Sequence, residues 1–344
     1  MKKILLIRTD RIGDVILTLP AVHTLREQMP GAKISMLISP LTLDLVSGHP
    51  DIDEVLIDDK DGRHKGVRGF LKLVEEIRSK EFAVVINFHT KKRTNLLCFL
   101  SGIPHRIGYR NEKFGFLLTE KIPDVRPQGK KHESEYCFDL LKPLGISTGT
   151  LTMSLPYQES AEQWAAGFFQ QLGVKTKGLK YVALHLGASC PTKRWPVMNF
   201  AALVRNIYDR HPVQFILIGT MDQKPLVVEL KRIVPHVPFE DLSGKLSLSK
   251  TVSVIKRCDL LISNDSGPVH IAAAAGTPVV SIFTRNQPGI NPGRWRPLGP
   301  CSVFVAPPQD MSISFAKGEV RDDRFLYCIT PEQVLTVVDA VLQV

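Results

Sequence analysis

Eight short apolar segments, separated by stretches of helical spacing, constrain the fold of this chain more than any other feature of its sequence. Apolar residues run almost continuously through each segment, which is typical of strands buried on both faces of a parallel sheet. The segments form two series, at residues 2–7, 33–38, 54–58 and 82–88, and at residues 181–187, 214–219, 259–265 and 278–283. The sequence therefore predicts an α/β fold with two doubly wound, Rossmann-like domains.

The stretches between the strands carry apolar residues three and four positions apart, which predicts helices. They lie at residues 21–29, 69–80, 200–210, 224–234, 248–258 and 331–344, the last with Pro331 in its first turn. A polar stretch at 155–178 interrupts the pattern. We therefore expect an N-terminal domain over 1–165 and a C-terminal domain over 175–344, facing each other across a cleft. The last helix is expected to pack on the second domain or back on the first.

The composition is that of a globular protein, with 44% hydrophobic and 23% charged residues. No run approaches the ~18 apolar residues of a membrane span. The apolar run after Lys2 and Lys3 is shorter than the ~7–15 residues of a signal-peptide core, so we expect a cytoplasmic protein. Six cysteines form no C-x-x-C pair, and we expect them to be reduced, partly buried thiols.

The formal net charge of +10 favours a polyanionic partner, such as a nucleic acid, an anionic lipid or a phosphorylated glycan. Zinc-finger spacing, RNP-type aromatic runs and an isolated basic helix are all missing from the sequence, so we expect no nucleic-acid partner. The sequence also lacks G-x-G-x-x-G after the first strand and G-x-x-x-x-G-K-[ST] anywhere. This argues against a nicotinamide dehydrogenase and against a P-loop NTPase.

The stretch DLLISNDSGPVHIAAAAGTPVVSIF at 259–283 is the most informative local signal. A strand ends at Asp265, Ser266-Gly267 makes a turn, and a short Ala-rich helix runs to Gly276, which suits the C′ position. The free N–H groups and positive dipole end of such a helix suit a phosphate or diphosphate. An ordinary βαβ turn with an Asp or Ser N-cap is the alternative. His270 either contacts the ligand or covers the helix end.

A second polar loop follows the strand at 181–187 and presents Ser189 and Lys193. A lysine there can neutralise the charge that develops on a leaving diphosphate, although a solvated loop cation is the alternative. Asp222 follows the next strand. It is expected either to bind ribose hydroxyls or to cap the following helix.

The segment GDVILTLP places Gly13 and Asp14 after the first strand and Pro20 within an apolar run. Proline is excluded from the undisturbed interior of a helix, so the helix either starts late or kinks at Pro20. In both cases we expect Gly13-Asp14 in the first β-to-α loop. There Asp14 serves as a helix cap or as a proton acceptor.

The basic stretch HTKKRTN at 89–95 follows the fourth strand. Lys91, Lys92 and Arg93 either bind an anionic acceptor or form a solvated turn. The segment RIGYR at 106–110 is expected to be structural.

Four of these stretches together resemble the heptosyltransferases, the family 9 glycosyltransferases that build bacterial lipopolysaccharide cores. They are RTDRIGDVILTLPAV, HLGASCPTKRWP, NDSGPVHIAAAAGTPVV and LSGKLSLSKTVSVIKRCDLLIS. The resemblance spans nearly the whole chain and implies the GT-B architecture. It implies an inverting transferase that moves heptose from ADP-L-glycero-D-manno-heptose to the inner core of lipopolysaccharide, with no cofactor required. The alternatives are sugar transfer to a protein or another surface glycan, and a catalytically silent nucleotide-sugar-binding protein.

The resemblance also implies roles for individual residues. Asp14 would be the general base, Lys193 would hold the donor diphosphate, and Leu246 would lie near the nucleobase. The implied donor-binding residues are Gly13, Ser189, Lys193, Asp222, Leu246, Asp265, Ser266, Gly267 and His270, and the acceptor-binding residues are Lys91, Lys92 and Arg93. The acceptor would be a lipid-linked anionic glycan, with peripheral contact to the cytoplasmic face of the inner membrane.

Two departures from the family pattern accompany these matches. Thr284-Arg285-Asn286 follows the last apolar strand, where the family often has a Gly-Pro turn, and Asp222 stands where the family often has Glu. Both bear on the identity of donor and acceptor more than on transferase chemistry.

Overall fold

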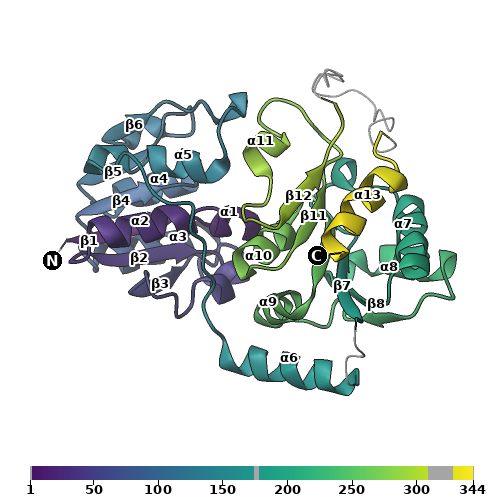
Figure 1. Ribbon diagram of the computed structural model, residues 1–344. Helices are drawn as coiled ribbons and strands as arrows, with labels where there is room; N and C mark the ends of the chain where they lie inside the picture. The colour runs from purple at the N-terminus through teal and green to yellow at the C-terminus, as the bar shows by residue number, and fades with distance from the viewer. Residues whose placement is uncertain (1, 174–177, 309–327, 344) are drawn as a thin grey trace. The chain divides into compact units, whose positions relative to one another are not determined.

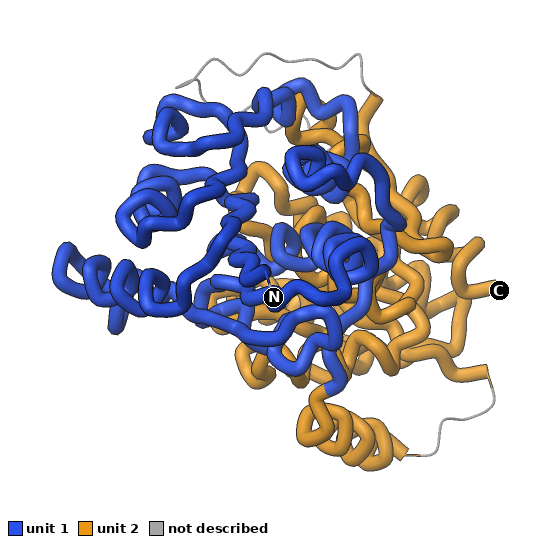
Figure 2. The backbone as a smooth tube through the Cα atoms, turned by 90° about the vertical axis from the view of Figure 1, so that its left-hand side faces the viewer, with its two compact units in different colours: residues 1–157 blue, residues 158–344 orange. Residues whose placement is uncertain are grey.

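The computed structural model describes residues 2–173, 178–308 and 328–343, and the chain forms two compact units, 1–157 and 158–344 (Figures 1 and 2). Each unit contains one parallel six-stranded sheet, which confirms the α/β prediction. The unit boundary falls early in the polar stretch at 155–178. Helix α6 (Glu159–Gln171), which the sequence pattern did not predict, occupies much of that stretch and packs against α9 (Leu248–Arg257) in the second unit.

The first sheet has the strand order β3-β2-β1-β4-β5-β6. Its strands are β1 (Lys3–Ile7), β2 (Lys33–Ile38), β3 (Glu54–Ile57), β4 (Val84–Asn87), β5 (His105–Tyr109) and β6 (Glu120–Ile122). The four predicted strands are confirmed, and they are the consecutive neighbours from β3 to β4. Strand β5 and the edge strand β6 were missed because HRIGY and EKI are short and begin with polar residues that are exposed or partly exposed.

The helices of the first unit cover the sheet in two pairs, with α3 contacting α4 and α2 contacting α5. Leu73, Val74 and Ile77 of α3 and Leu97 and Cys98 of α4 pack on strand residues in one core. The helices are α1 (Ile12–Ile16), α2 (Leu19–Gln28), α3 (Gly66–Arg78), α4 (Lys92–Leu100) and α5 (Glu133–Asp139).

The chain after β1 forms two helices where the sequence suggested one. Helix α1 ends at Ile16, and α2 begins at Leu19 with Pro20 in its first turn. Of the two expectations for Pro20, the late helix start is therefore confirmed. The expected loop position of Gly13-Asp14 is wrong, because both residues lie in the first turn of α1. The missing proline N–H falls where a helix has no partner for it anyway.

The second sheet has the order β12-β11-β10-β7-β8-β9. Its strands are β7 (Lys180–His185), β8 (Val213–Leu217), β9 (Phe239–Asp241), β10 (Leu260–Asn264), β11 (Val279–Ile282) and β12 (Ser302–Val305). In this sheet the four predicted strands are the central ones, and the edge strands β9 and β12 were missed. The remaining helices are α7 (Val197–Arg210), α8 (Lys224–Ile233), α10 (Gly267–Ala275), α11 (Pro292–Trp295) and α13 (Pro331–Leu342).

The last helix belongs to the second unit. Val334, Leu335 and Val338 of α13 are buried in one core with Phe200 of α7 and Phe215 of β8, and α13 packs along α7. Of the two expectations for this helix, packing on the second domain is therefore the one that the structure shows. The apolar side chains of α13 are thus buried within its own unit.

Over the part of the chain that the structure describes, no helix is both long enough and apolar enough to cross a bilayer. The six cysteines are free thiols; Cys98, Cys137 and Cys258 are buried, and Cys301 is exposed. The prediction that these thiols are partly buried is confirmed.

Candidate active site

Both sheets have a topological switch point, where the strand order reverses and two neighbouring loops diverge. It lies between β1 and β4 in the first unit and between β7 and β10 in the second. Ligands of doubly wound sheets bind beyond the carboxyl ends of the strands at this point. The residues after β1 and β4, and after β7 and β10, are therefore the first place to look for chemistry.

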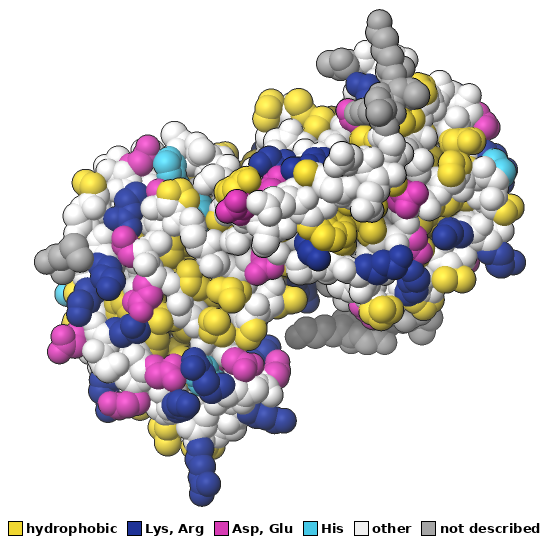
Figure 3. Space-filling model, turned by 90° about the horizontal axis from the view of Figure 1, so that it is seen from below, with side chains coloured by type: hydrophobic (Ala, Val, Ile, Leu, Met, Phe, Trp, Pro, Cys, Tyr) yellow, Lys and Arg dark blue, Asp and Glu magenta, His cyan; other side chains and the backbone are white. Residues whose placement is uncertain are grey.

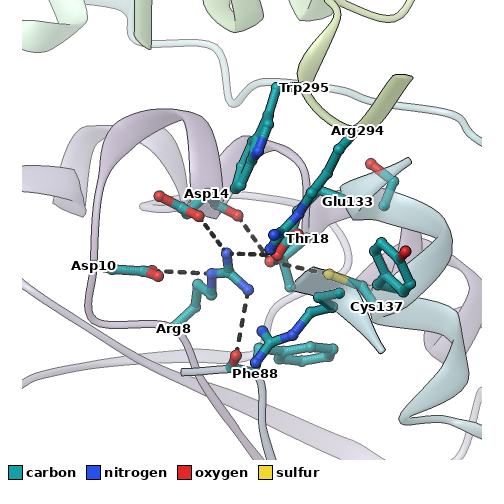
Figure 4. Close-up of polar contacts among 12 residues, drawn as sticks. Arg8, Asp10, Asp14, Thr18, Phe88, Glu133, Cys137, Arg294 and Trp295 are labelled. Carbon is teal, nitrogen blue, oxygen red and sulfur yellow. Dashed lines mark hydrogen bonds and ion pairs between the residues drawn. The ribbon is translucent and has the colours of Figure 1, made fainter. Parts of the chain in front are cut away.

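In the first unit, the switch point holds a buried guanidinium surrounded by carboxylates (Figure 4). Arg8 directly follows β1. Its Nη2 donates to Asp14 Oδ1 at 2.5 Å and to Glu133 Oε1 at 3.2 Å, and its Nε pairs with Asp10 Oδ1 at 2.9 Å. Nη1 donates to the carbonyl oxygen of Phe88, just after β4, at 3.4 Å. One arginine thus joins the β1 loop, the β4 loop and the start of α5.

Burial and charge oppose each other in this cluster. The side chains of Arg8 and Glu133 are 3% and 1% exposed. Burial alone would lower the pKa of Arg8, but Asp10, Asp14 and Glu133 together raise it well above its ordinary value. Burial raises the pKa of Asp10 to about 6, and the neighbouring Asp14 carboxylate adds to this effect while Arg8 opposes it. Arg8 thus contacts three carboxylates, and Arg126 and Lys91 act electrostatically on Glu133 and Asp10 from further away.

Asp14 and Asp10 are the accessible members of the cluster, with 16% and 19% of their side chains exposed, and of the two only Asp14 lies in a helix. It lies in the first turn of α1, whose N-cap residue is Arg11, so Asp14 is not the N-cap. Its backbone is held as well, because Thr18 Oγ1 donates to the carbonyl oxygen of Asp14 at 2.9 Å. The result is an oriented carboxylate with an accessible face, as a proton acceptor requires.

Glu133 reaches the cluster because its helix starts at a defined point. His132 is the N-cap of α5 and accepts a bond from the Ser134 N–H at 3.3 Å, while Glu135 accepts from the His132 N–H at 2.7 Å. This reciprocal capping places Glu133 in the first helical position. Sequence reasoning missed Arg8, Asp10 and Glu133. The Arg-x-Asp pair after the first strand was a usable signal, whereas Glu133 carried none.

The basic residues after β4 have different environments. Arg93 donates to both oxygens of Asp58, from Nε at 2.8 Å and from Nη2 at 2.6 Å, so its guanidinium is already engaged within the protein. The side chains of Lys91 and Lys92 belong to exposed residues. Burial lowers the pKa of Lys91, and the neighbouring Lys113 lowers it further. The two lysines are thus the accessible cations beside the first switch point.

His89 lies between these lysines and the arginine cluster. Its Nδ1 is 3.0 Å from Thr9 Oγ1. Burial lowers the pKa of His89 to about 4, with Arg8 and Lys91 acting in the same direction. It is therefore neutral near pH 7. The RIGYR segment is structural as predicted: Arg106, at the start of β5, donates to the carbonyl oxygens of Ile103 and Leu117.

In the second unit, Lys193 and Asp265 meet at the switch point. Lys193, in the loop after β7, forms an ion pair with Asp265, directly after β10, and their side chains are 19% and 12% exposed. Ser266 is the N-cap residue of α10 but makes no side-chain cap bond, and Gly267 begins the helix. The start of α10 thus has both a cation beside it and backbone N–H groups. Gly276 ends α10 in the left-handed conformation at φ 78°, as predicted.

Polar side chains hold the two loops together. Asn264 Oδ1 accepts from the Trp195 N–H at 2.9 Å, and its Nδ2 donates to the Leu186 carbonyl oxygen at 2.8 Å. Thr284, after β11, donates to the carbonyl oxygen of Thr192 at 2.7 Å. These bonds fix the loop that carries Lys193 from both of the neighbouring strand ends.

A buried histidine supports the start of α10. His185, the last residue of β7, has Nδ1 3.1 Å from the hydroxyls of both Ser263 and Ser266. Burial lowers the pKa of His185 to about 4, against smaller opposing effects of Gln223 and Asp222. A neutral imidazole therefore orients Ser266. His270, one turn into α10, is 3% exposed, so it lies mainly under the helix start.

The remaining predicted donor residues lie beyond the strand ends of the second sheet. Ser189 is exposed in the loop after β7, and Leu246 is half-buried in the loop after β9. Asp222 is exposed in a short 3-10 helix after β8, whose N-cap is Thr220. The alternative of Asp222 as an N-cap is therefore wrong. Gly13, by contrast, belongs to α1 of the first unit.

Among the described residues, no three His, Cys, Asp or Glu side chains are grouped so that they could hold a metal ion. Two Asp-x-Asp triplets occur, at 51–53 and 59–61. Asp51 contacts His23 at 2.9 Å, and Asp53 accepts from Arg26 at 2.6 Å. Asp59 accepts from the Gly62 and Arg63 N–H groups. These three carboxylates already have partners within the protein.

Known proteins resemble this chain over almost its full length. The model of glycosyltransferase family 9 (heptosyltransferase) matches residues 70–321. Lipopolysaccharide heptosyltransferase 3 of Escherichia coli strain K12 is 28% identical over 276 residues, which cover 79% of each chain.

Two solved structures share the fold. A family 9 glycosyl transferase from Veillonella parvula is 25% identical with a TM-score of 0.85, covering 99% of this chain and 97% of that one. The E. coli ADP-heptose lps heptosyltransferase II has a TM-score of 0.76 at 23% identity, covering 100% of this chain and 99% of that one.

The chain has two doubly wound units, each with polar residues at its switch point. Together with these matches, this architecture defines a glycosyltransferase of the GT-B fold class. Within that class, the chain belongs to glycosyltransferase family 9, the heptosyltransferase family.

Proposed function

We propose that this enzyme transfers heptose from ADP-L-glycero-D-manno-heptose to the inner core of lipopolysaccharide, with inversion at the anomeric carbon. The names of two relatives support this donor and acceptor: an ADP-heptose lps heptosyltransferase II and a lipopolysaccharide heptosyltransferase 3. The observation that carries the proposal is an accessible, oriented carboxylate at one switch point and a lysine beside a helix start at the other.

In the proposed reaction, an acceptor hydroxyl oxygen forms a bond to the anomeric carbon while the bond from that carbon to the ADP oxygen breaks. Asp14 takes the hydroxyl proton, and ADP leaves with the bonding electron pair. A positioned general base contributes roughly 10²–10⁴ in rate. The first unit thus supplies the base, and the second unit supplies positive charge for the leaving group.

Arg8 acts in this proposal as a positioning residue for Asp14. Its bond to Asp14 Oδ1 at 2.5 Å sets the direction of the carboxylate, and Glu133 and the Phe88 carbonyl oxygen set the direction of the guanidinium. Because the guanidinium is a planar fork, it holds this geometry better than a lysine would. The base therefore needs little reorganisation when the acceptor binds.

On the donor side, Lys193 and the N–H groups at the start of α10 would bind the diphosphate. In the free enzyme, Asp265 neutralises Lys193. When the donor binds, the diphosphate would take over the ammonium, and Asp265 would turn to a sugar hydroxyl. We assign the ribose to Asp222, the adenine to the neighbourhood of Leu246, and the remaining sugar and phosphate contacts to Ser189, Ser266, Gly267 and His270. Because these groups supply the positive charge, we propose transfer without a required metal or other cofactor.

On the acceptor side, Lys91 and Lys92 would bind phosphate or carboxylate groups of the core, since both are exposed beside the first switch point. Arg93 would act indirectly, because Asp58 holds its guanidinium. Gly13, in the first turn of α1, would allow close approach beside Asp14 rather than contact ADP. We place the enzyme in the cytoplasm, with peripheral contact to the inner membrane that carries its lipid-linked acceptor.

The test is ADP release by purified enzyme with ADP-heptose and a heptose-free core acceptor. We expect release that requires both substrates, and a product with the anomeric configuration opposite to that of the donor. UDP-, GDP- and CMP-sugars serve as controls and should neither raise the melting temperature nor react. Absence of ADP release with the folded enzyme would refute the heptosyl assignment, and retention of configuration would refute the direct displacement.

A further inference from the structure

Helix α3 exposes apolar side chains on its first half, although its core-facing side is complete. Leu73, Val74 and Ile77 are buried on the sheet. Val67 and Leu71, one turn apart, are 76% and 52% exposed. Successive residues of an α-helix are rotated by about 100° around its axis. Val67 and Leu71 therefore lie beside the buried residues and widen the apolar face of the helix beyond the side that packs on the sheet. Solvent-facing positions of a globular helix are normally polar, so these side chains suit a second apolar environment.

Cations surround this apolar pair. Lys65, Arg68 and Lys72 are exposed, and across the described residues their side chains make no hydrogen bond or ion pair. The last turn of the same helix differs, because Arg78 pairs there with Glu75 at 3.5 Å. The first half of α3 therefore offers three unneutralised positive charges beside two apolar side chains. Figure 3 shows basic side chains beside apolar ones on the first unit, at the left.

A further exposed apolar residue, Phe116, lies in the short 3-10 helix η2 (Gly115–Leu117). Phe116 is 71% exposed and contacts Phe114 edge to face, with the ring centroids 6.0 Å apart. Phe114 has φ 61°, a conformation that a bulky residue rarely adopts. Buried Asn95 holds the loop by donating to the Lys113 carbonyl oxygen at 2.8 Å. The protein thus maintains a strained loop that presents an aromatic ring and a lysine to the outside.

The α3 and η2 segments adjoin the same helix, α4, which contacts both of them. Arg93 of α4 lies over the ring of Phe70 in α3 at 4.9 Å, and Lys92 lies over the ring of Phe114 at 5.8 Å. The starts of α3 and α4 and the η2 loop all follow carboxyl ends of strands. They therefore form one surface at the edge of the sheet where the acceptor is expected.

We propose that this α3–η2 surface, defined by Val67, Arg68, Leu71, Lys72, Lys113 and Phe116, docks the enzyme on an anionic lipid bilayer. The proposal rests on the proposed function in one respect, since a lipid-linked acceptor explains why docking occurs at the acceptor edge. Cations attract acidic headgroups, and apolar side chains among them enter the headgroup–acyl boundary.

The test measures binding of the full chain to vesicles by flotation, without substrate. Vesicles of phosphatidylcholine with about one third phosphatidylglycerol are compared with pure phosphatidylcholine. The test variants are the triple substitution Arg68→Ser/Leu71→Ser/Lys72→Ser and the single substitution Phe116→Ser. The matched control is Val228→Ser/Lys231→Ser/Arg232→Ser on α8, where Val228 is 57% exposed beside two exposed cations.

We expect binding to the anionic vesicles only. The triple α3 variant should bind at least about thirtyfold more weakly, from two lost cations alone, and Phe116→Ser roughly tenfold more weakly. The α8 control should bind like the unmodified protein, and all variants should melt within about 2 °C of it, because every substituted side chain is exposed.

Equal binding to both vesicle types, or equal weakening by the α8 control, would overturn the proposal. So would a Phe116→Ser variant that binds vesicles normally but has a raised KM for a lipid-free acceptor, since the ring would then be a sugar platform. Vesicle binding as expected together with no ADP release would instead refute only the proposed reaction. The two failures are therefore distinguishable.

Discussion

Replacing Arg8 by methionine tests the arginine–carboxylate cluster most directly. The change keeps an unbranched, although shorter, side chain and removes its charge, so Asp10, Asp14 and Glu133 lose the guanidinium that they share. Removing one partner of a buried ion pair costs about 3–5 kcal/mol. For a unit of about 157 residues, this lowers the melting temperature of the first unit by roughly 6–20 °C. Acidification should relieve part of the loss, because protonating a carboxylate removes the uncompensated charge.

The kinetic effect separates positioning from charge balance. We expect kcat of Arg8→Met to fall by roughly 10², part of the 10²–10⁴ that a general base supplies, with the KM for ADP-heptose nearly unchanged. The double variant Arg8→Met/Glu133→Gln removes a carboxylate together with the cation. It should recover a large part of the stability and little of the rate.

The measurements are thermal and urea unfolding at pH 5.5 and 7.5, and ADP release at saturating donor. Arg8→Lys serves as the conservative control; it retains the charge but loses the planar fork, so its stability should exceed that of Arg8→Met. If the double variant regained the full kcat, Arg8 would only balance charge. If Arg8→Met were as stable as the unmodified protein, the buried cluster would not contribute as reasoned.

Four further predictions concern the rest of the site. Asp14→Asn should lower kcat by about 10²–10⁴ while leaving the Kd for ADP-heptose within about twofold; a large loss of donor affinity by calorimetry would mean a structural role. Lys193→Ala should weaken ADP binding roughly 10–100-fold, as expected for a charged hydrogen bond, and unchanged binding would rule out its assignment. Because the folded pKa of Asp10 is raised from 3.8 to about 6, the protein should lose on the order of 3 kcal/mol of stability between pH 4 and pH 7 relative to Asp10→Asn; parallel urea-unfolding curves at both pH values would contradict this. Chelation with EDTA should leave the rate of ADP release unchanged, since Lys193 and the start of α10 supply the positive charge, and activity restored only by added Mg²⁺ would disprove it.

The central strands and most helices could be predicted from the sequence because their signals are local. A strand buried on both faces must be apolar throughout, and a helix on a sheet must repeat its apolar residues at three and four positions. The same reasoning explains what was missed. Strands β5, β6, β9 and β12 lie toward the sheet edges, where solvent tolerates polar residues, and α6 occupies a stretch that was interpreted as a linker.

The residues of the candidate site also fall into a group that the sequence predicted and a group that it did not. Asp14, Lys193, Asp265 and the start of α10 could be predicted, because each lies in the segment that follows a strand and such segments lie at the binding edge of a parallel sheet. The ion pair between Lys193 and Asp265 follows from β7 and β10 being neighbours in the sheet order, although they lie far apart in the chain. The strand pairing therefore brings together two residues that the local sequence signals had identified separately.

The contacts that set the chemistry came from the tertiary structure alone. Arg8 and Glu133 are separated by 125 positions, and only the packing of α5 beside the β1 loop brings them together. Burial gives that contact a large effect on stability, because a charge removed from water must find partners within the fold. Sequence alone determined which residue types stand at the ends of the strands. Tertiary structure decided that Asp14 is held by a buried guanidinium and that Asp58 engages Arg93, since only folding determines which charges share a site without water.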